Sequence, residues 1–151
     1  MPTNFRAQIV RGPEQKLELE TLTDEKMIAA KLPPGEVTIR VRYSGLNYKD
    51  ALASRGHPGV VRNFPHVPGI DAAGEVLEST DAKFTPGQQV IVTGFGLGAA
   101  QWGAYAELIR VPVAWVIPLP RGLTMRQAMI IGTAGMTAAQ SIAALQHAGI
   151  T

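Results

Sequence analysis

The sequence contains no cysteine and only three histidines, His57, His66 and His147. Without cysteine, disulfide bonds and thiolate zinc sites are excluded. The histidines are widely separated along the chain, so they do not form a ligand pattern typical of a transition-metal site. We therefore expect a protein that holds no metal.

Charge is also sparse. The net charge is +2, charged residues make up 17% of the chain, and the basic residues are dispersed rather than gathered into a tract with aromatics. This pattern does not favour nucleic-acid binding. No apolar run approaches the roughly 18 residues expected of a membrane span, and the N-terminal MPTNFRAQIV lacks the features of a secretory signal. We expect a soluble, cytoplasmic protein with no nucleic-acid or membrane partner.

The first 120 residues have the pattern of a β protein. The stretch EVTIRVRY, residues 36–43, alternates apolar and polar side chains, which predicts a strand with one buried face. Because Gly and Pro turns separate the short strand candidates, a barrel or a partly open sandwich is expected. The other candidates are residues 6–10, 73–79, 90–92, 104–111 and 114–120.

The pattern changes to helical after Pro120. Thr124 followed by Gln127 is a capping-box pattern, and residues 136–148 are rich in alanine, with Gly149 placed to end the helix. One or two helices are therefore expected after the β body. The sequence stops just after them at Thr151, which favours a fragment of a longer protein.

The glycine-rich stretch GFGLGAAQWG, residues 94–103, differs from a phosphate-binding loop. The dinucleotide fingerprint Gly-x-Gly-x-x-Gly lies between a strand and a helix. Here Gly94, Gly96 and Gly98 have a different spacing, and a strand-like segment follows them. We interpret this stretch as an ordinary loop.

The stretch SGLNYKDALASRG predicts a short helix with candidate functional residues at its start. Asn47 is suited to the N-cap, Asp50 stands three residues later, and Gly56 closes the helix. Tyr48 and Lys49 are not explained by capping. At the start of a helix they could meet an anion or a carbonyl oxygen.

Two polar residues lie in the loop before the next strand. Arg62 is either solvated or an anion contact. For His66, a hydrogen-bonded or exposed side chain is favoured over a catalytic one.

Asp71 stands at the edge of a strand expected to be buried, where an isolated carboxylate would be very costly. A carboxylate that accepts backbone N–H bonds at the tight turn after Gly69 is favoured over a direct catalytic role. Thr133 and Thr137 lie in GTAGMTA, where two glycines would let a ligand approach the backbone. Helix capping by Thr133 is the alternative.

Taken in order, the stretches GLNYKDAL, RNFPHVPGIDAAGEV, GQQVIVTGFGLG, WGAYAEL and AMIIGTAGMTA resemble the medium-chain dehydrogenase/reductase superfamily. More narrowly, they resemble its zinc-free, quinone-oxidoreductase-like branch, which includes NADPH-dependent acryloyl-CoA reductases. The resemblance implies a mainly β fold, with a GroES-like β-barrel catalytic domain over residues 1–124. It also implies that residues 125–151 are the helical start of a Rossmann cofactor-binding domain whose remainder is absent.

The resemblance also implies how the site differs from that of zinc-dependent relatives. Those relatives carry a cysteine at the position of Asn47 and a Gly-His-Glu run at the positions of Gly69, Ile70 and Asp71. With both ligand positions changed, a catalytic zinc is not expected. Asp71, like Asp50, is then expected to hold the architecture of the cleft.

Residue roles are implied in the same way. Asn47 and Tyr48 match positions that face the nicotinamide and the substrate, and Tyr48 is the expected donor to a substrate or cofactor oxygen. Thr137 matches a threonine near the nicotinamide amide, and Thr133 lies one turn earlier. For the substrate, Arg62 is expected to meet the phosphates of a CoA thioester, while Lys49 replaces a proton-relay hydroxyl.

Three functions follow from these observations. The first is hydride transfer from NADPH to the β-carbon of an α,β-unsaturated carbonyl compound such as acryloyl-CoA. The second is reduction of a quinone. A third hypothesis, of a different class, is a non-catalytic β-barrel module that binds a partner. The apolar C-terminal stretch predicts self-association or a homodimer in any of these cases.

Overall fold

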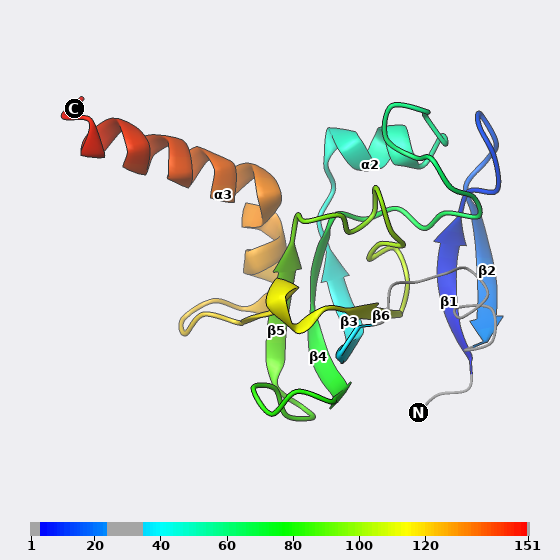
Figure 1. The fold of residues 1–151 in the computed structure, drawn as a ribbon, viewed down its shortest axis with the longest axis horizontal. Coiled ribbons are helices and arrows are strands. Elements are labelled where there is room, and N and C mark those ends of the chain that lie inside the picture. The colour runs from blue at the N-terminus through cyan, green and yellow to red at the C-terminus, as the bar shows by residue number, and fades with distance from the viewer. Residues whose placement is uncertain (1–3, 24–34, 151) are drawn as a thin grey trace.

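The computed structural model describes residues 4–23 and 35–150, which form two antiparallel sheets and a long C-terminal helix (Figure 1). Strands β1 (Asn4–Ile9) and β2 (Glu18–Thr23) pair with each other. The second sheet has the strand order β6-β3-β4-β5-β7. Its strands are β3 (Val37–Ser44), β4 (Asp71–Ser79), β5 (Gln89–Thr93), β6 (Leu108–Val111) and β7 (Ile117–Pro118).

The main core lies on one side of the five-stranded sheet and consists largely of branched aliphatic side chains. Such residues favour strands because they pack well on a pleated surface. A second cluster joins the two sheets, since Phe5 and Ile9 of β1 pack with Val67 and Leu108. The buried strand residues of the main core include Val37, Ile39, Val76, Val90, Val92 and Val111.

The expected mainly β body with a helical C-terminal segment is confirmed, and most strand predictions hold. Residues 36–43, 73–79 and 90–92 correspond to β3, β4 and β5, and residues 6–10 to β1. The predictions for 104–111 and 114–120 were only partly right. Only Leu108–Val111 is a strand in the first, and the second divides into a 3₁₀ helix, Val113–Trp115, and β7.

The segment before β6 is not a regular strand because it bonds to β1 through a single bridge rather than a ladder. Gln8 N donates to Tyr105 O at 2.8 Å, and Glu107 N donates to Arg6 O at 2.9 Å.

Strand β2 was not predicted at all. Its Leu19 is 66% exposed and only Leu22 is buried, so its sequence lacks the alternation of a half-buried strand.

Within residues 4–23 and 35–150, two α-helices accompany the sheets. The short helix α2 (Tyr48–Ala53) follows β3, and α3 (Met125–His147) follows β7. The capping box of α3 is confirmed, because Gln127 N donates to Thr124 Oγ1 at 3.2 Å and Thr124 N donates to Gln127 Oε1 at 2.9 Å. Gly149, with φ of 78°, follows the C-cap as predicted.

Helix α3 bends at Gly132, which has φ of 51° and ψ of −161°. Before the bend, Ala128 and Met129 are buried against Ala73 of β4. After the bend the helix leaves the barrel, as the orange-to-red ribbon of Figure 1 shows. Most of this second part is exposed, including Ile142 at 57% and Leu145 at 49%.

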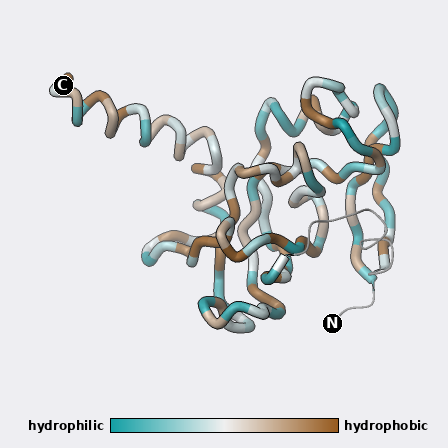
Figure 2. Tube along the Cα trace, in the orientation of Figure 1, coloured by the Kyte–Doolittle hydropathy of each residue, from teal (hydrophilic) through white to brown (hydrophobic). Residues whose placement is uncertain are grey.

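By length and composition alone, α3 could cross a membrane. Its most apolar window has a mean hydropathy of 1.4, and 11% of that window is buried. This corrects the expectation that no segment reaches that threshold. The Ala, Ile, Met and Leu residues of α3 raise the average, while the interspersed Gly, Thr, Ser and Gln residues prevent an obvious apolar run. Figure 2 shows brown, apolar positions spread along the helix. Core helices of globular proteins have the same composition.

Candidate functional site

Two completely buried carboxylates, Asp50 and Asp71, lie at the end of the sheet where β3 leads into α2 and β4 begins. The side-chain amide of Asn47 lies between them. Its Nδ2 donates to Asp71 Oδ2 at 2.8 Å and to Asp50 Oδ2 at 3.2 Å. Among residues 4–23 and 35–150, neither carboxylate has an ion-pair partner, so hydrogen-bond donors compensate both charges.

Asp50 holds the tight turn that leads into β4. Its Oδ1 accepts bonds from Gly69 N at 3.2 Å and Ile70 N at 2.9 Å, and its Oδ2 accepts one from Asn47 N at 2.8 Å. The last bond confirms the capping role predicted for Asp50. The turn after Gly69 had been assigned to Asp71, and that prediction was wrong, because α2 carries Asp50 across to the turn while Asp71 faces α3.

Asp71 connects the barrel to α3. Its Oδ2 accepts a bond from Thr133 N at 3.1 Å, and its Oδ1 accepts one from Thr133 Oγ1 at 2.6 Å. Thr133 therefore does not cap the helix with its own hydroxyl. Thr137 lies one turn later, is exposed, and donates its hydroxyl to Thr133 O at 2.8 Å.

Sequence reasoning missed Tyr105, which lies beside this cluster. Its hydroxyl donates to Gly45 O at 3.3 Å. Burial, followed by the negative charges of Asp50 and Asp71, raises the pKa of Tyr105 to about 12. The phenol therefore stays protonated at neutral pH and remains a donor. Its stretch, WGAYAEL, was part of the family resemblance, but nothing in the local pattern indicated that Tyr105 would meet two carboxylates distant in sequence.

The other candidate residues predicted from the sequence form no hydrogen bond with Asp50 or Asp71 in the described part of the chain. Tyr48 is 81% exposed at the start of α2, and Lys49 and Arg62 are also exposed. His66 is buried, and its Nε2 lies 3.0 Å from Gly98 O. Burial lowers the pKa of His66, so this residue is a hydrogen-bonded structural histidine, as favoured from the sequence.

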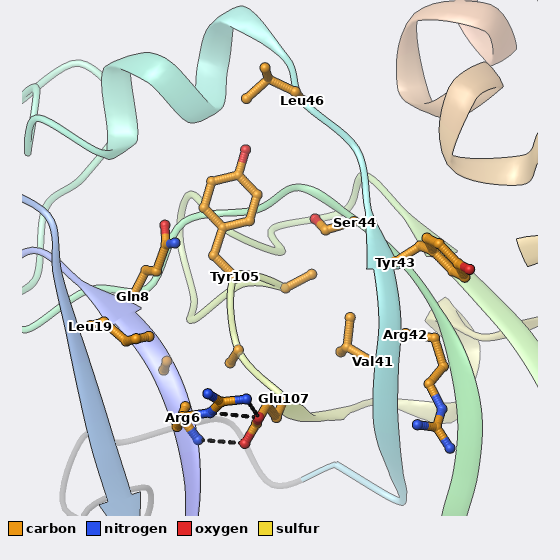
Figure 3. A pocket seen from close by; sticks show the side chains of 13 residues that line it. Arg6, Gln8, Leu19, Val41, Arg42, Tyr43, Ser44, Leu46, Tyr105 and Glu107 are labelled. Atoms are coloured by element: carbon orange, nitrogen blue, oxygen red, sulfur yellow. Dashed lines mark hydrogen bonds and ion pairs between the residues drawn. The ribbon is translucent and has the colours of Figure 1, made fainter. Parts of the chain in front are cut away.

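A groove of about 630 Å³ opens between β1, β3 and the segment before β6 (Figure 3). The ion pair of Arg6 and Glu107, with Nη2 and Oε1 2.6 Å apart, lies in it, and the hydrogen bonds from Arg6 lower the pKa of Glu107. Tyr105 lines the groove and also lies near the carboxylates. None of the candidate site residues predicted from the sequence lines this groove, which adjoins the cluster of Asn47, Asp50 and Asp71 through Tyr105.

The carboxylate cluster does not fit a zinc ion. The described residues contain no group of three His, Cys, Asp or Glu side chains that could hold a metal. Moreover, N–H and O–H donors already face Asp50 and Asp71. A cation would have to displace these donors, and the amide of Asn47 cannot replace a thiolate or an imidazole.

The sheet order and the helix leading out of the barrel agree with a catalytic domain of the GroES-like type. The sequence profile of the alcohol dehydrogenase GroES-like domain matches residues 33–121. The chain belongs to this family and represents the N-terminal portion of a medium-chain dehydrogenase/reductase.

Similar proteins include the acrylyl-CoA reductase AcuI of Ruegeria pomeroyi, 44% identical over 97% of this chain and 44% of the relative. The structure of the yhdH oxidoreductase from Salmonella enterica in complex with NADP has a TM-score of 0.84 and 46% identity, over 95% of this chain and 44% of that one. Bacillus subtilis yhfP with NAD bound has a TM-score of 0.88 and 39% identity, over 99% of this chain and 44% of that one. The chain thus spans less than half the length of these relatives.

Asp50→Ala is expected to lower the free energy of unfolding by about 3 kcal/mol or more, because it leaves the buried Gly69 and Ile70 N–H groups without an acceptor. Urea unfolding followed by circular dichroism measures this loss. Asp81→Ala is the control, since Asp81 accepts a bond from Lys83 N at an exposed turn, and about 1 kcal/mol is expected there. Equal losses for the two variants would contradict the role given to Asp50.

Proposed function

We propose that this chain is the catalytic-domain portion, residues 1–124, and the first helical segment, residues 125–151, of a longer NADPH-dependent reductase. The reaction proposed is reduction of the C=C bond of an α,β-unsaturated carbonyl compound, with acryloyl-CoA as the leading candidate. The observation that carries this proposal is the 44% identity to an acrylyl-CoA reductase over 97% of the chain.

NADPH is the proposed cofactor because a solved relative at 46% identity is a complex with NADP. When bound, it supplies the hydride. The residues of this chain are proposed to contact only its nicotinamide end. The candidates there are Tyr48, Thr133 and Thr137, and the sequence contains no Gly-x-Gly-x-x-Gly turn between a strand and a helix for the pyrophosphate.

The contribution of the chain's own residues is to orient the substrate and to stabilise charge. Negative charge develops on the carbonyl oxygen as the double bond is reduced, and fixed donors near that oxygen stabilise it. Both N–H groups of the Asn47 amide already donate to the two carboxylates, so Asn47 would face the nicotinamide or substrate with its Oδ1 acceptor, and Tyr48 is the adjacent donor to the carbonyl oxygen. We propose these two as catalytic residues, with Lys49 and Arg62 as contacts for the acyl-CoA.

Zinc independence is part of the proposal. It is supported by the absence of cysteine and by the donors that already saturate Asp50 and Asp71. Without a metal, polarisation of the carbonyl depends on hydrogen-bond donors, which gives Tyr48 its importance. A cytoplasmic location is proposed from the same likeness to bacterial oxidoreductases.

The test is an assay of the protein encoded by the complete reading frame around this chain. NADPH oxidation is followed at 340 nm, roughly the absorbance maximum of the reduced nicotinamide, with acryloyl-CoA and separately with a small quinone. Turnover of acryloyl-CoA is expected. Turnover of the quinone alone would favour the second candidate, which is supported by a Bacillus subtilis relative, YhfP, that carries a quinone-oxidoreductase name and is 41% identical.

Tyr48→Phe is expected to lower kcat of that enzyme about 100-fold while KM changes little, because a donor used mainly in the transition state is lost. Steady-state kinetics with acryloyl-CoA measures the effect. Tyr43→Phe is the matched control, since Tyr43 is a half-exposed tyrosine of β3 with no proposed role. An unchanged kcat for Tyr48→Phe would remove Tyr48 from the mechanism.

A non-catalytic binding module is the alternative of a different class, and the exposed apolar side chains of α3 favour it. Ile130, Ile142 and Leu145 are each at least 49% exposed. We expect the 151-residue chain to self-associate through α3, because exposed apolar area of this kind is normally covered. Sedimentation velocity measures this, with Ile142→Lys expected to shift the chain toward monomer. A monomeric wild-type chain would contradict the expectation.

A further inference from the structure

The bend in α3 is built around a direct contact with the barrel. Gly132 has φ of 51° and ψ of −161°, a combination that essentially only glycine adopts. A Cβ atom added there would lie 2.9 Å from Asp71 Oδ2. The bend therefore requires glycine for two reasons, the backbone angle and the space taken by the carboxylate.

The second part of the helix begins directly after this bend. Asp71, the first residue of strand β4, caps its N-terminal end. The first N–H groups of a helix have no partner within the helix. Here Thr133 N donates to Asp71 Oδ2 at 3.1 Å, and Thr133 Oγ1 donates to Oδ1 at 2.6 Å. A negative charge at this end of a helix is also favourable for the helix dipole.

The same carboxylate oxygen holds the amide of Asn47. Asp71 Oδ2 accepts from both Thr133 N and Asn47 Nδ2, at 3.1 and 2.8 Å. The space around this oxygen is closed on the other side as well, since a Cβ at Gly45 would lie 3.0 Å from it. A change in the direction of α3 must therefore move this oxygen or break one of its two bonds.

We propose that Asp71 is a positioning residue that couples the direction of α3 after Gly132 to the orientation of the Asn47 amide. Through this carboxylate, the helix that carries Thr133 and Thr137 is held in register with the start of α2, which carries Asn47 and Tyr48. The importance of this coupling for catalysis rests on the proposed function. The coupling itself is a property of this chain and is tested without any assay of activity.

The direction of the helix is measured by double electron–electron resonance between spin labels. Because the chain has no cysteine, labels attach only where cysteine is introduced. One pair, Lys83→Cys with Gln140→Cys, spans the bend. The control pair, Lys83→Cys with Arg126→Cys, ends before it, and all of these positions are exposed. Labelled chains are diluted with unlabelled chain so that only distances within one molecule contribute.

The orientation of the amide is measured by the side-chain NH₂ resonances of Asn47 in chain labelled with ¹⁵N-asparagine. Asn4 and Asn63 provide reference signals from elsewhere in the chain. The variants are Gly132→Ala, which puts a methyl group against the Asp71 carboxylate, and Asp71→Ala, which removes the acceptor. Thr137→Val is the matched control, because Thr137 lies in the same helix and its side chain bonds only to Thr133 O among the described residues.

In both test variants, the distance between positions 83 and 140 is expected to shift or broaden, while that between 83 and 126 stays as in the wild type. The Asn47 resonances move in Gly132→Ala, and those of Asn4 and Asn63 do not. Thr137→Val leaves both measurements unchanged. If Asp71→Ala does not fold, Gly132→Ala decides alone. An unchanged 83–140 distance, an equal change in both pairs, or a displaced helix with unmoved Asn47 resonances overturns the coupling.

Discussion

The buried pair of carboxylates is the constraint on which the rest of this structure depends. Asp50 and Asp71 are fully buried without a cationic partner among the described residues, and burial of an uncompensated charge would be prohibitively costly. Their donors come from the start of α2, the turn at Gly69 and the bend of α3. Because every one of these donors must stay in place, three segments distant in sequence are fixed relative to one another.

This arrangement keeps several polar side chains ordered at one end of the sheet. The Asn47 amide is held by both carboxylates, and Thr133 is held by Asp71. The two threonines of α3 and the polar residues of α2 therefore lie at the same end of the sheet. The donor role proposed for exposed Tyr48 requires that water be excluded from it, since hydrogen bonds are stronger in a low-dielectric site.

Sequence reasoning succeeded where the interaction is local. The capping residues Asp50 and Thr124 and the terminating Gly149 lie within a few residues of the backbone groups they serve. It failed for β2, which has no buried face that the sequence could reveal and forms a strand through its pairing with β1. It also failed for the segment before β6, where bonds to β1 form one bridge instead of a ladder.

The sequence by itself determined the mainly β body, the helix boundaries and the family, because strand periodicity, capping patterns and family motifs are all local in the chain. Only the tertiary structure decided which carboxylate serves which segment. Asp50 bonds Ile70 at a separation of 20 residues, and Asp71 bonds Thr133 at a separation of 62. A carboxylate accepts a bond from any donor that the fold brings near, so its partner depends on how α2, β4 and α3 pack and not on its neighbours in sequence.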